Sequence, residues 1–443
     1  MIPMKSLLAC ALFHIGSASA MSLLQAYEAA LQNDPVYRAA VHENEAGKQY
    51  AVLGRANLLP TASISYSASR NQADITAPNA SGGQTANHVE YAGSAATIAL
   101  RQPILNLDGL ARYRQGIAQT HYSDAQFAGR QQDLMLRLVG AYTDAHYAQD
   151  QLSLALAQRD AFAEQQRVNA RRFQKGEGTR TDVLETQAKL ELAEAQVIEA
   201  RDSLTNARNA LAAIVGVEVT QLDALSDGFR VKPMQPATLG EWKQLATEKN
   251  AEIAAQRHAL ETARQEIDKN RAGHMPRLDL VANYGRNKSE SISTFNQDST
   301  VRNIGVQLTI PLYAGGSVQA ATSQAVANHA KAKAELDSIS SKVWVDLRKQ
   351  YSLALSSAAR IDALMRSVDA ARLLIDATRL SVQGGVRVNL DLLNAEQQLH
   401  AARRDLAQAR YGYLLSYLRL RFSAGTLGMN DLRDMAGYFV APR

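Results

Sequence analysis

The residues best placed to do chemistry in this 443-residue chain lie in and just after two glycine-rich turns. Gly176 and Gly178 belong to the first turn, and Gly384 and Gly385 to the second. A glycine-rich loop ahead of a helix can cradle a phosphate with its backbone N–H groups. We instead interpret both turns as breaks between consecutive helices. Asp182 is expected to cap the helix after the first turn, since its carboxylate can accept free backbone N–H groups.

No other group of reactive side chains indicates an enzyme. The sequence has no nucleophile motif, no phosphate-binding glycine loop and no His/Cys cluster with metal-ligand spacing. We therefore predict no catalytic, cofactor-binding or metal site. The net charge of +5 is too small to indicate a nucleic-acid partner, and runs of Lys and Arg are absent. Any energy must come from a partner, so a passive conduit is expected.

The N-terminus has the features of a secretory signal, predicted to cover residues 1–20. Lys5 supplies the positive charge, residues 7–15 form a short apolar segment, and small residues at 17–20 precede Met21. Lipoprotein cleavage at Cys10 would leave an apolar segment of only about four or five residues. We expect this single cysteine to be removed with the signal. The mature protein would then be held together by packing and not by disulfides.

The chain contains an internal duplication. Pro103 recurs as Pro311 (311 − 103 = 208) and Asp182 recurs as Asp391 (391 − 182 = 209). A near-constant offset along both halves indicates two copies of one unit. The predicted organisation is a first repeat at 21–216, a connector and equatorial segment at 217–240, a second repeat at 241–425, and a C-terminal equatorial tail at 426–443.

Each repeat contains two runs in which apolar and small polar residues alternate. This pattern is typical of a half-buried strand and equally of a membrane-barrel strand. The predicted strands cover about 61–70, 94–103, 278–285 and 303–311. Residues 71–93 and 286–302 are rich in Asn, Ser, Gly, Thr and Asp, so we expect exposed loops there. After the signal no run of about 18–20 apolar residues exists. The protein is therefore either soluble in the periplasm or crosses a membrane by strands.

A very long helix is predicted after each strand pair. A stretch of some 65 residues without proline would span roughly 100 Å as a helix. Each long helix is followed by one of the glycine turns and a returning helix, and shorter outer helices complete each repeat. The predicted helices cover 108–173 and 316–382 (long), 181–215 and 389–423 (returning), and 23–58 and 241–271 (outer).

Four strands per chain cannot close a membrane barrel, because the smallest barrels need about eight. Open strand edges are untenable in lipid, so chains must share a barrel. Three chains would supply 3 × 4 = 12 strands. The predicted fold is mainly α with membrane β. It is a trimeric channel-tunnel in which a shared 12-stranded β-barrel is continued by a long α-helical coiled-coil barrel, with a small mixed equatorial region. The alternative is a soluble periplasmic adaptor-like coiled-coil protein.

The sequence resembles the TolC family of outer-membrane efflux proteins, and most closely the branch that serves type I secretion. The resemblance covers essentially the whole mature chain. The motifs that carry it are ALQNDP at 30–35, QPI at 102–104, GTRTDVL at 178–184, IPLYAGG at 310–316 and GVRVNLDLLNA at 385–395.

This resemblance implies a homotrimer in the outer membrane of a Gram-negative bacterium, in contact with outer-membrane lipid, with its tunnel in the periplasm. The implied partners are a periplasmic adaptor (membrane fusion protein) and an inner-membrane ABC transporter or proton-driven pump. The implied function is a passive exit duct of a tripartite export system for type I protein secretion. Efflux of small molecules or drugs is the alternative.

The resemblance also assigns roles to residues near the two turns. Asp391 is expected to form a ring of three carboxylates in the lumen. Asn394 occupies the position of a second ring, so one anionic constriction is predicted. Arg387 is expected to bond near Thr181 and Asp182 and hold the tip closed.

Other interpretations of these residues remain open. Asp391 could be an ordinary solvated carboxylate. Arg387 and Asp182 could form a surface ion pair that stabilises the protein by less than about 1 kcal/mol. The turn glycines Gly176, Gly178, Gly384 and Gly385 are expected at tips that dock a partner. The spacing from Gly178 to Asp182 is four residues and that from Gly385 to Asp391 is six. We expect this difference to give the two carboxylates different roles.

Overall fold

The computed structural model describes residues 20–78, 82–226, 228–290 and 295–440. The predicted signal peptide, apart from Ala20, lies outside these residues. The chain divides into two units. Unit 1 comprises Met1–Val41, Phe127–Ala251 and Ser341–Arg443, and unit 2 comprises His42–Gln126 and Glu252–Ser340. None of the described helices is long and apolar enough to cross a membrane.

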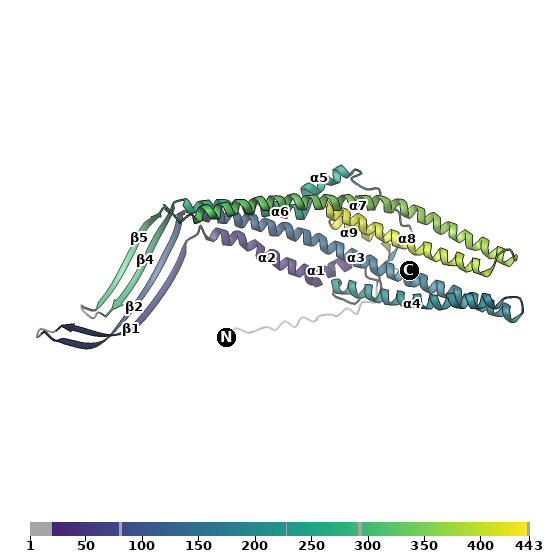
Figure 1. Ribbon diagram of the computed structural model, residues 1–443, viewed down its shortest axis with the longest axis horizontal. Coiled ribbons are helices and arrows are strands. Elements are labelled where there is room, and N and C mark those ends of the chain that lie inside the picture. The colour runs from purple at the N-terminus through teal and green to yellow at the C-terminus, as the bar shows by residue number, and fades with distance from the viewer. Residues whose placement is uncertain (1–19, 79–81, 227, 291–294, 441–443) are drawn as a thin grey trace, which may run out of the picture. The chain divides into compact units, whose positions relative to one another are not determined.

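Unit 2 contains a four-stranded antiparallel sheet with the order β1-β2-β4-β5 (Figure 1). It also holds most of α2 and α6, the first parts of α3 and α7, and the short 3-10 helix η1. Two glycines let α2 and α3 approach closely. A Cβ on Gly116 would lie 2.3 Å from the Tyr50 carbonyl oxygen, and one on Gly54 2.7 Å from that of Arg112. The bounds are β1 Thr61–Pro78, β2 Gln84–Leu105, β4 Arg277–Ser289, β5 Gln297–Thr309, α2 Pro35–Ala56, α6 Ala251–Arg271 and η1 Ala272–His274.

The strands extend further than the sequence predicts, and most of the predicted loops at 71–93 and 286–302 are strand. Polar side chains pair across the ladder in these parts. Arg70 Nη2 lies 2.6 Å from Glu90 Oε2, and Arg286 Nη2 lies 2.8 Å from Asp298 Oδ2. Such cross-strand pairs stabilise a sheet, so a polar composition alone does not indicate a loop.

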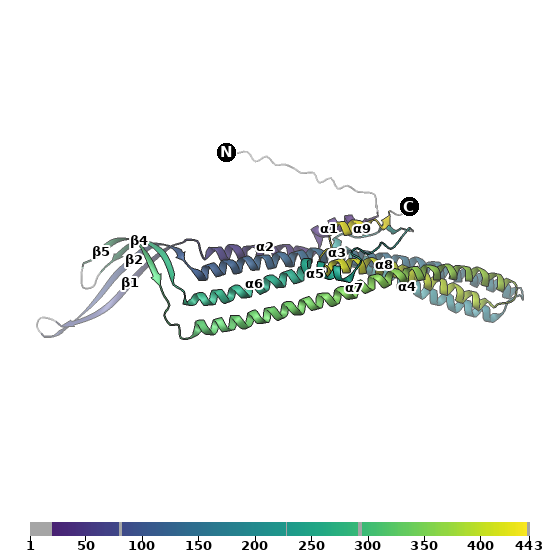
Figure 2. The same ribbon diagram turned by 90° about the horizontal axis from the view of Figure 1, so that it is seen from above.

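Unit 1 consists mainly of two helical hairpins, α3 with α4 and α7 with α8 (Figures 1 and 2). Its main core includes Leu138, Tyr142, Leu211 and Leu414, which are almost completely buried. The long and returning helices lie within about a residue of their predicted bounds. The elements are α1 Leu23–Asn33, α3 Leu107–Gln174, α4 Arg180–Val215, β3 Ala224–Leu225, α5 Leu239–Lys249, α7 Ser317–Gln383, α8 Asn389–Ser423, α9 Met429–Ala436 and β6 Phe439–Val440.

Each predicted outer helix is in fact two helices. The first is broken at Asp34, whose side chain accepts a hydrogen bond from the Tyr37 backbone N–H (2.9 Å) and caps α2. The same carboxylate, in a residue only 2% exposed, receives Arg137 Nη2 at 2.7 Å. Burial would raise the pKa of Asp34, but the Arg137 and Tyr37 hydrogen bonds outweigh it and lower the pKa. Asn250 marks the second break, between α5 and α6.

The two returning helices end in the same way. Asn33 Nδ2 donates to the carbonyl of Val215, the last residue of α4, at 2.9 Å. Asn250 Nδ2 donates to the carbonyl of Ser423, the last residue of α8, also at 2.9 Å. We call these two contacts the asparagine clamps. A glycine with positive φ follows each clamped end, Gly216 at 80° and Gly425 at 69°. The duplication therefore fixes both returning helices at their C-terminal ends.

Candidate functional site at the two helical turns

The two turns have the same backbone geometry. Gly176 has φ 74° and Gly385 has φ 73°, a left-handed conformation that glycine adopts without a Cβ penalty. The residue after each glycine donates its N–H to a carbonyl five residues earlier, Glu177 to Arg172 and Val386 to Ser381, both at 2.9 Å. This bonding closes the C-terminus of a helix. Gly178 and Gly384 do not have positive φ.

These angles correct the comparison of the two repeats. The equivalent glycines are Gly176 and Gly385 (385 − 176 = 209), so the spacing to the following carboxylate is six residues in both copies. The predicted difference of four against six was wrong, because it paired Gly385 with Gly178. Asp182 and Asp391 therefore occupy the same position in the first turn of α4 and α8.

The carboxylates nevertheless differ in their bonding, because the residue before each helix differs. The N-cap of α4 is Thr179 and not Asp182, as the sequence had suggested. Thr179 Oγ1 donates to Asp182 Oδ2 at 2.7 Å, and the Asp182 N–H donates back to Thr179 Oγ1 at 3.1 Å. This is a capping box. Val388 stands at the equivalent N-cap of α8 and has no side chain that can cap. Within the described part of the chain, the half-buried Asp391 carboxylate has no hydrogen-bond or ion-pair partner.

The remaining predicted site residues lie on the surface of this end of unit 1. Thr181, Arg387 and Asn394 are exposed. The Arg387 guanidinium bonds to neither Thr181 nor Asp182 within this single chain as described. The latch stays a prediction.

A buried group of amide and hydroxyl side chains joins the two hairpins where no contact was predicted. We call Gln165, Asn169, Thr186 and Asn389 the tip cluster. Gln165 Nε2 donates to Asn389 Oδ1 at 2.6 Å, and Asn169 Nδ2 donates to Thr186 Oγ1 at 2.8 Å. Asn389 Nδ2 reaches Thr186 Oγ1 at 3.4 Å. Thr186 in turn donates to the Asp182 carbonyl at 2.7 Å.

The tip cluster links α3, α4 and α8, and three of its residues are buried. Apolar packing beside it comes from Phe162, Ala193 and Leu393 on the same three helices. Buried polar groups that satisfy one another rigidify a contact and make it specific. The sequence did carry a signal: Gln165 and Asn169 follow Phe162 at helical spacing, on the face that packs against the neighbouring helices.

Further along α8, burial disfavours charge on two side chains. It raises the pKa of the Glu396 carboxyl, against the opposing effect of Arg379. It lowers the pKa of the His400 imidazole, and the charge of Arg403 acts in the same direction. Glu396 Oε2 and His400 Nδ1 are buried atoms without a hydrogen-bond partner. The described residues contain no group of three or more His, Cys, Asp or Glu side chains arranged to hold a metal ion.

Comparison with known proteins assigns the chain to a family. The family described as "Outer membrane efflux protein" matches residues 26–217 and 242–426. The chain belongs to the outer membrane efflux protein family. The chain is 45% identical to the alkaline protease secretion protein AprF of Pseudomonas aeruginosa, over 96% of this chain and 88% of that protein. It is 40% identical to the proteases secretion protein PrtF of Dickeya chrysanthemi, over 96% and 92%.

Solved structures of outer-membrane channels have the same fold as this outer membrane efflux protein. The CmeC channel of Campylobacter jejuni gives a TM-score of 0.77 at 17% identity, over 99% of this chain and 98% of that chain. The open state of the MtrE channel of Neisseria gonorrhoeae gives 0.75 at 22% identity, over 93% and 92%. The expected channel-tunnel fold and the resemblance to the TolC family are thereby confirmed. The protein is an outer-membrane protein, and its family forms export ducts.

Proposed function

We propose that this protein is the passive outer-membrane duct of a type I secretion system and that its cargo is a secreted protein. The observation that carries the proposal is the 45% and 40% identity to AprF and PrtF over 96% of this chain. Identity to TolC of Escherichia coli, over 94% of the chain, is 28%. The likeness to CmeC and MtrE concerns the fold alone and does not favour drug efflux.

The proposed assembly is a homotrimer with a shared 12-stranded barrel (3 × 4). In the single chain β1 and β5 are the edges of the sheet, so each has one side without a neighbouring strand. Apolar side chains on the sheet and on α7 are widely exposed, for example Ile304 (75%) and Leu373 (71%). A second and third copy would pair the edges, and lipid and neighbouring protomers would cover these side chains.

The turns at Gly176, Gly178, Gly384 and Gly385 are the proposed docking points for a periplasmic adaptor and an inner-membrane ABC transporter. Asp391, whose carboxylate is not used for capping, is proposed to form the anionic constriction, with the neutral Asn394 one turn further on. Arg387 with Thr181 and Asp182 remains the proposed latch between helices. The tip cluster adds a second connection that must open when the α7–α8 hairpin moves away from α3 and α4.

Deletion of the gene in its host tests the cargo class. Loss of protease activity from the culture medium, with unchanged susceptibility to small toxic compounds, is the expected result. Restoration of secretion by the intact gene on a plasmid is the control. Normal extracellular protease together with new drug sensitivity would contradict the proposal and favour the efflux alternative.

A further inference from the structure

A pocket lies in unit 2, where the strands of the sheet meet the helices. β2 ends at Leu105 and α3 begins at Leu107, while β4 begins at Arg277. The pocket has a volume of about 440 Å³ and is lined by residues from α3, α6, η1, β4, β5 and α7 and from the segment after β5. We call it the junction pocket. Since the strands are the membrane part of this outer-membrane protein, the pocket lies at the edge of the membrane on the side of the helices.

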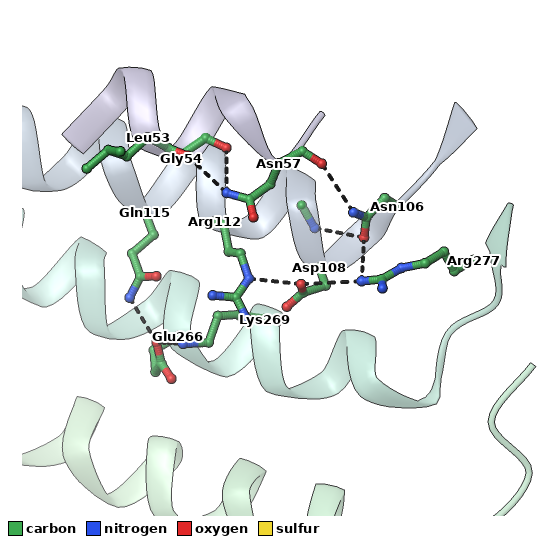
Figure 3. Close-up of polar contacts among 11 residues, drawn as sticks. Leu53, Gly54, Asn57, Asn106, Asp108, Arg112, Gln115, Glu266, Lys269 and Arg277 are labelled. Atoms are coloured by element: carbon green, nitrogen blue, oxygen red, sulfur yellow. Dashed lines mark hydrogen bonds and ion pairs between the residues drawn. The ribbon is translucent and has the colours of Figure 1, made fainter. Parts of the chain in front are cut away.

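Positive side chains converge on the junction pocket from three elements (Figure 3). Arg112 Nε donates to Asp108 Oδ2 at 2.9 Å, and Arg277 Nη2 lies 3.6 Å from the same oxygen. Two guanidinium groups thus share one carboxylate. The third cation, Lys269, is paired with Glu266. Three cations against two carboxylates leave an excess of one positive charge.

The two arginines retain most of their hydrogen-bonding capacity. A guanidinium has five N–H donors in a planar fork that suits phosphate oxygens. In the described residues Arg112 uses only Nε, and Arg277 uses only Nη2, which also donates to Asn106 Oδ1 at 3.3 Å. Both side chains are exposed by 40% or more, so the unused donors can reach a ligand.

An apolar surface adjoins this cationic pocket. Pro311 and Val318 contribute to its lining. Leu312 and Tyr313, directly after Pro311, are 90% and 86% exposed. Large apolar side chains exposed to that degree at the end of membrane strands are typical of contact with lipid, and tyrosine is enriched at membrane–water interfaces. A small free anion would use the arginines but leave this apolar surface uncovered.

We propose that the junction pocket binds a phospholipid, with the headgroup phosphodiester on Arg112 and Arg277 and the acyl chains against Leu312 and Tyr313. The lipid oxygens would take up the unused guanidinium donors and neutralise the excess charge. The bound lipid would fix the level of the protein in the leaflet on the helix side of the membrane. This inference rests on the outer-membrane location and not on the proposed cargo.

Native mass spectrometry of the purified full-length protein in detergent tests the proposal. Short-chain phosphatidylglycerol is titrated into wild type, Arg112→Gln/Arg277→Gln and the control Arg114→Gln. Arg114 is an exposed arginine of α3 outside the pocket lining. We expect the double variant to bind the lipid about 100-fold more weakly, since each hydrogen bond between charged groups is worth roughly a tenfold step or more and two guanidinium groups are lost. The control should bind like wild type.

A second measurement separates lipid from free anion. Inorganic phosphate and glycerol 3-phosphate are added as competitors, and neither should displace the lipid at equal concentration. Arg112→Gln alone keeps the pairing of Arg277 with Asp108, and its lipid affinity should fall about tenfold. This single variant carries the test if the double variant does not assemble. Equal lipid binding by wild type and the arginine variants, or full displacement by inorganic phosphate, would overturn the proposal.

Discussion

Replacing Asn389 with alanine should weaken the closed arrangement of the two hairpins. The substitution removes the acceptor for Gln165 (2.6 Å) and a donor to Thr186 (3.4 Å), and it leaves the Gln165 amide without this partner. Gln165 keeps its hydrogen bond to Asn169 Oδ1 (3.3 Å), so the loss is that of two hydrogen bonds, each contributing about 1 kcal/mol net. We estimate about 2 kcal/mol per protomer, which shifts an equilibrium between closed and open tips by roughly 30-fold.

Single-channel conductance in planar bilayers measures this shift. The Asn389→Ala channel should show higher conductance or longer open times than wild type. Gln187→Ala is the matched control, because Gln187 is the exposed neighbour of Thr186 on α4 and should leave conductance unchanged. The reasoning is refuted if Asn389→Ala conducts like wild type while thermal unfolding shows that the protein has lost stability. The tip cluster would then be a static packing contact.

Three further results are expected. Val388→Thr should create a capping box with Asp391 and stabilise α8 by about 1 kcal/mol. It should also weaken block of the channel by multivalent cations, and so should Asp391→Ala. Unchanged block in both variants would place the cation site elsewhere. Burial lowers the pKa of His146 to about 4, so the folded state favours the neutral ring, and stability should fall as the pH drops from about 6.5 to 4. His146→Phe should remove up to about 3 kcal/mol of this pH dependence in urea unfolding, whereas an identical slope would assign it to other groups. Arg387→Ala should raise conductance if the guanidinium holds Asp182 of an adjacent protomer, and an unaltered conductance would dismiss the latch.

The long helices were predictable because proline-free, alanine- and leucine-rich sequence leaves few other conformations to the chain. The ends of the strands were not predictable in the same way. Arg286 and Asp298 look like loop residues in sequence, but they stabilise the ladder because they form an ion pair between β4 and β5. The break of the first outer helix at Asp34 has a local signal, because Pro35 begins α2 and proline is favoured at the first position of a helix. The hydrogen bond from Arg137 to Asp34, 103 residues apart in the sequence, has no such signal.

The site shows the same division between local and long-range information. Sequence spacing located both turns, and the 209-residue offset of the repeats already pairs Gly176 with Gly385; the positive φ of both glycines confirms this pairing. When the two turns are aligned on these glycines, the N-cap of α4 is Thr179 and that of α8 is Val388. This difference explains why the Asp182 carboxylate takes part in a capping box and the Asp391 carboxylate does not. The tip cluster was missed because each of its members is an ordinary polar residue on its own helix. Their common contact exists only in the packed structure.

The asparagine clamps make each returning helix a lever. α4 is held at its C-terminal end by Asn33, and its 36 residues span about 54 Å from there to the turn. A rotation of only about 5° at the clamped end would therefore carry the turn sideways by about 5 Å, close to the rise of one helical turn. Small changes in packing around Asn33 and Asn250 would be amplified at the far ends of the helices. Substitutions close to the clamps could thus affect channel opening as strongly as substitutions at the turns.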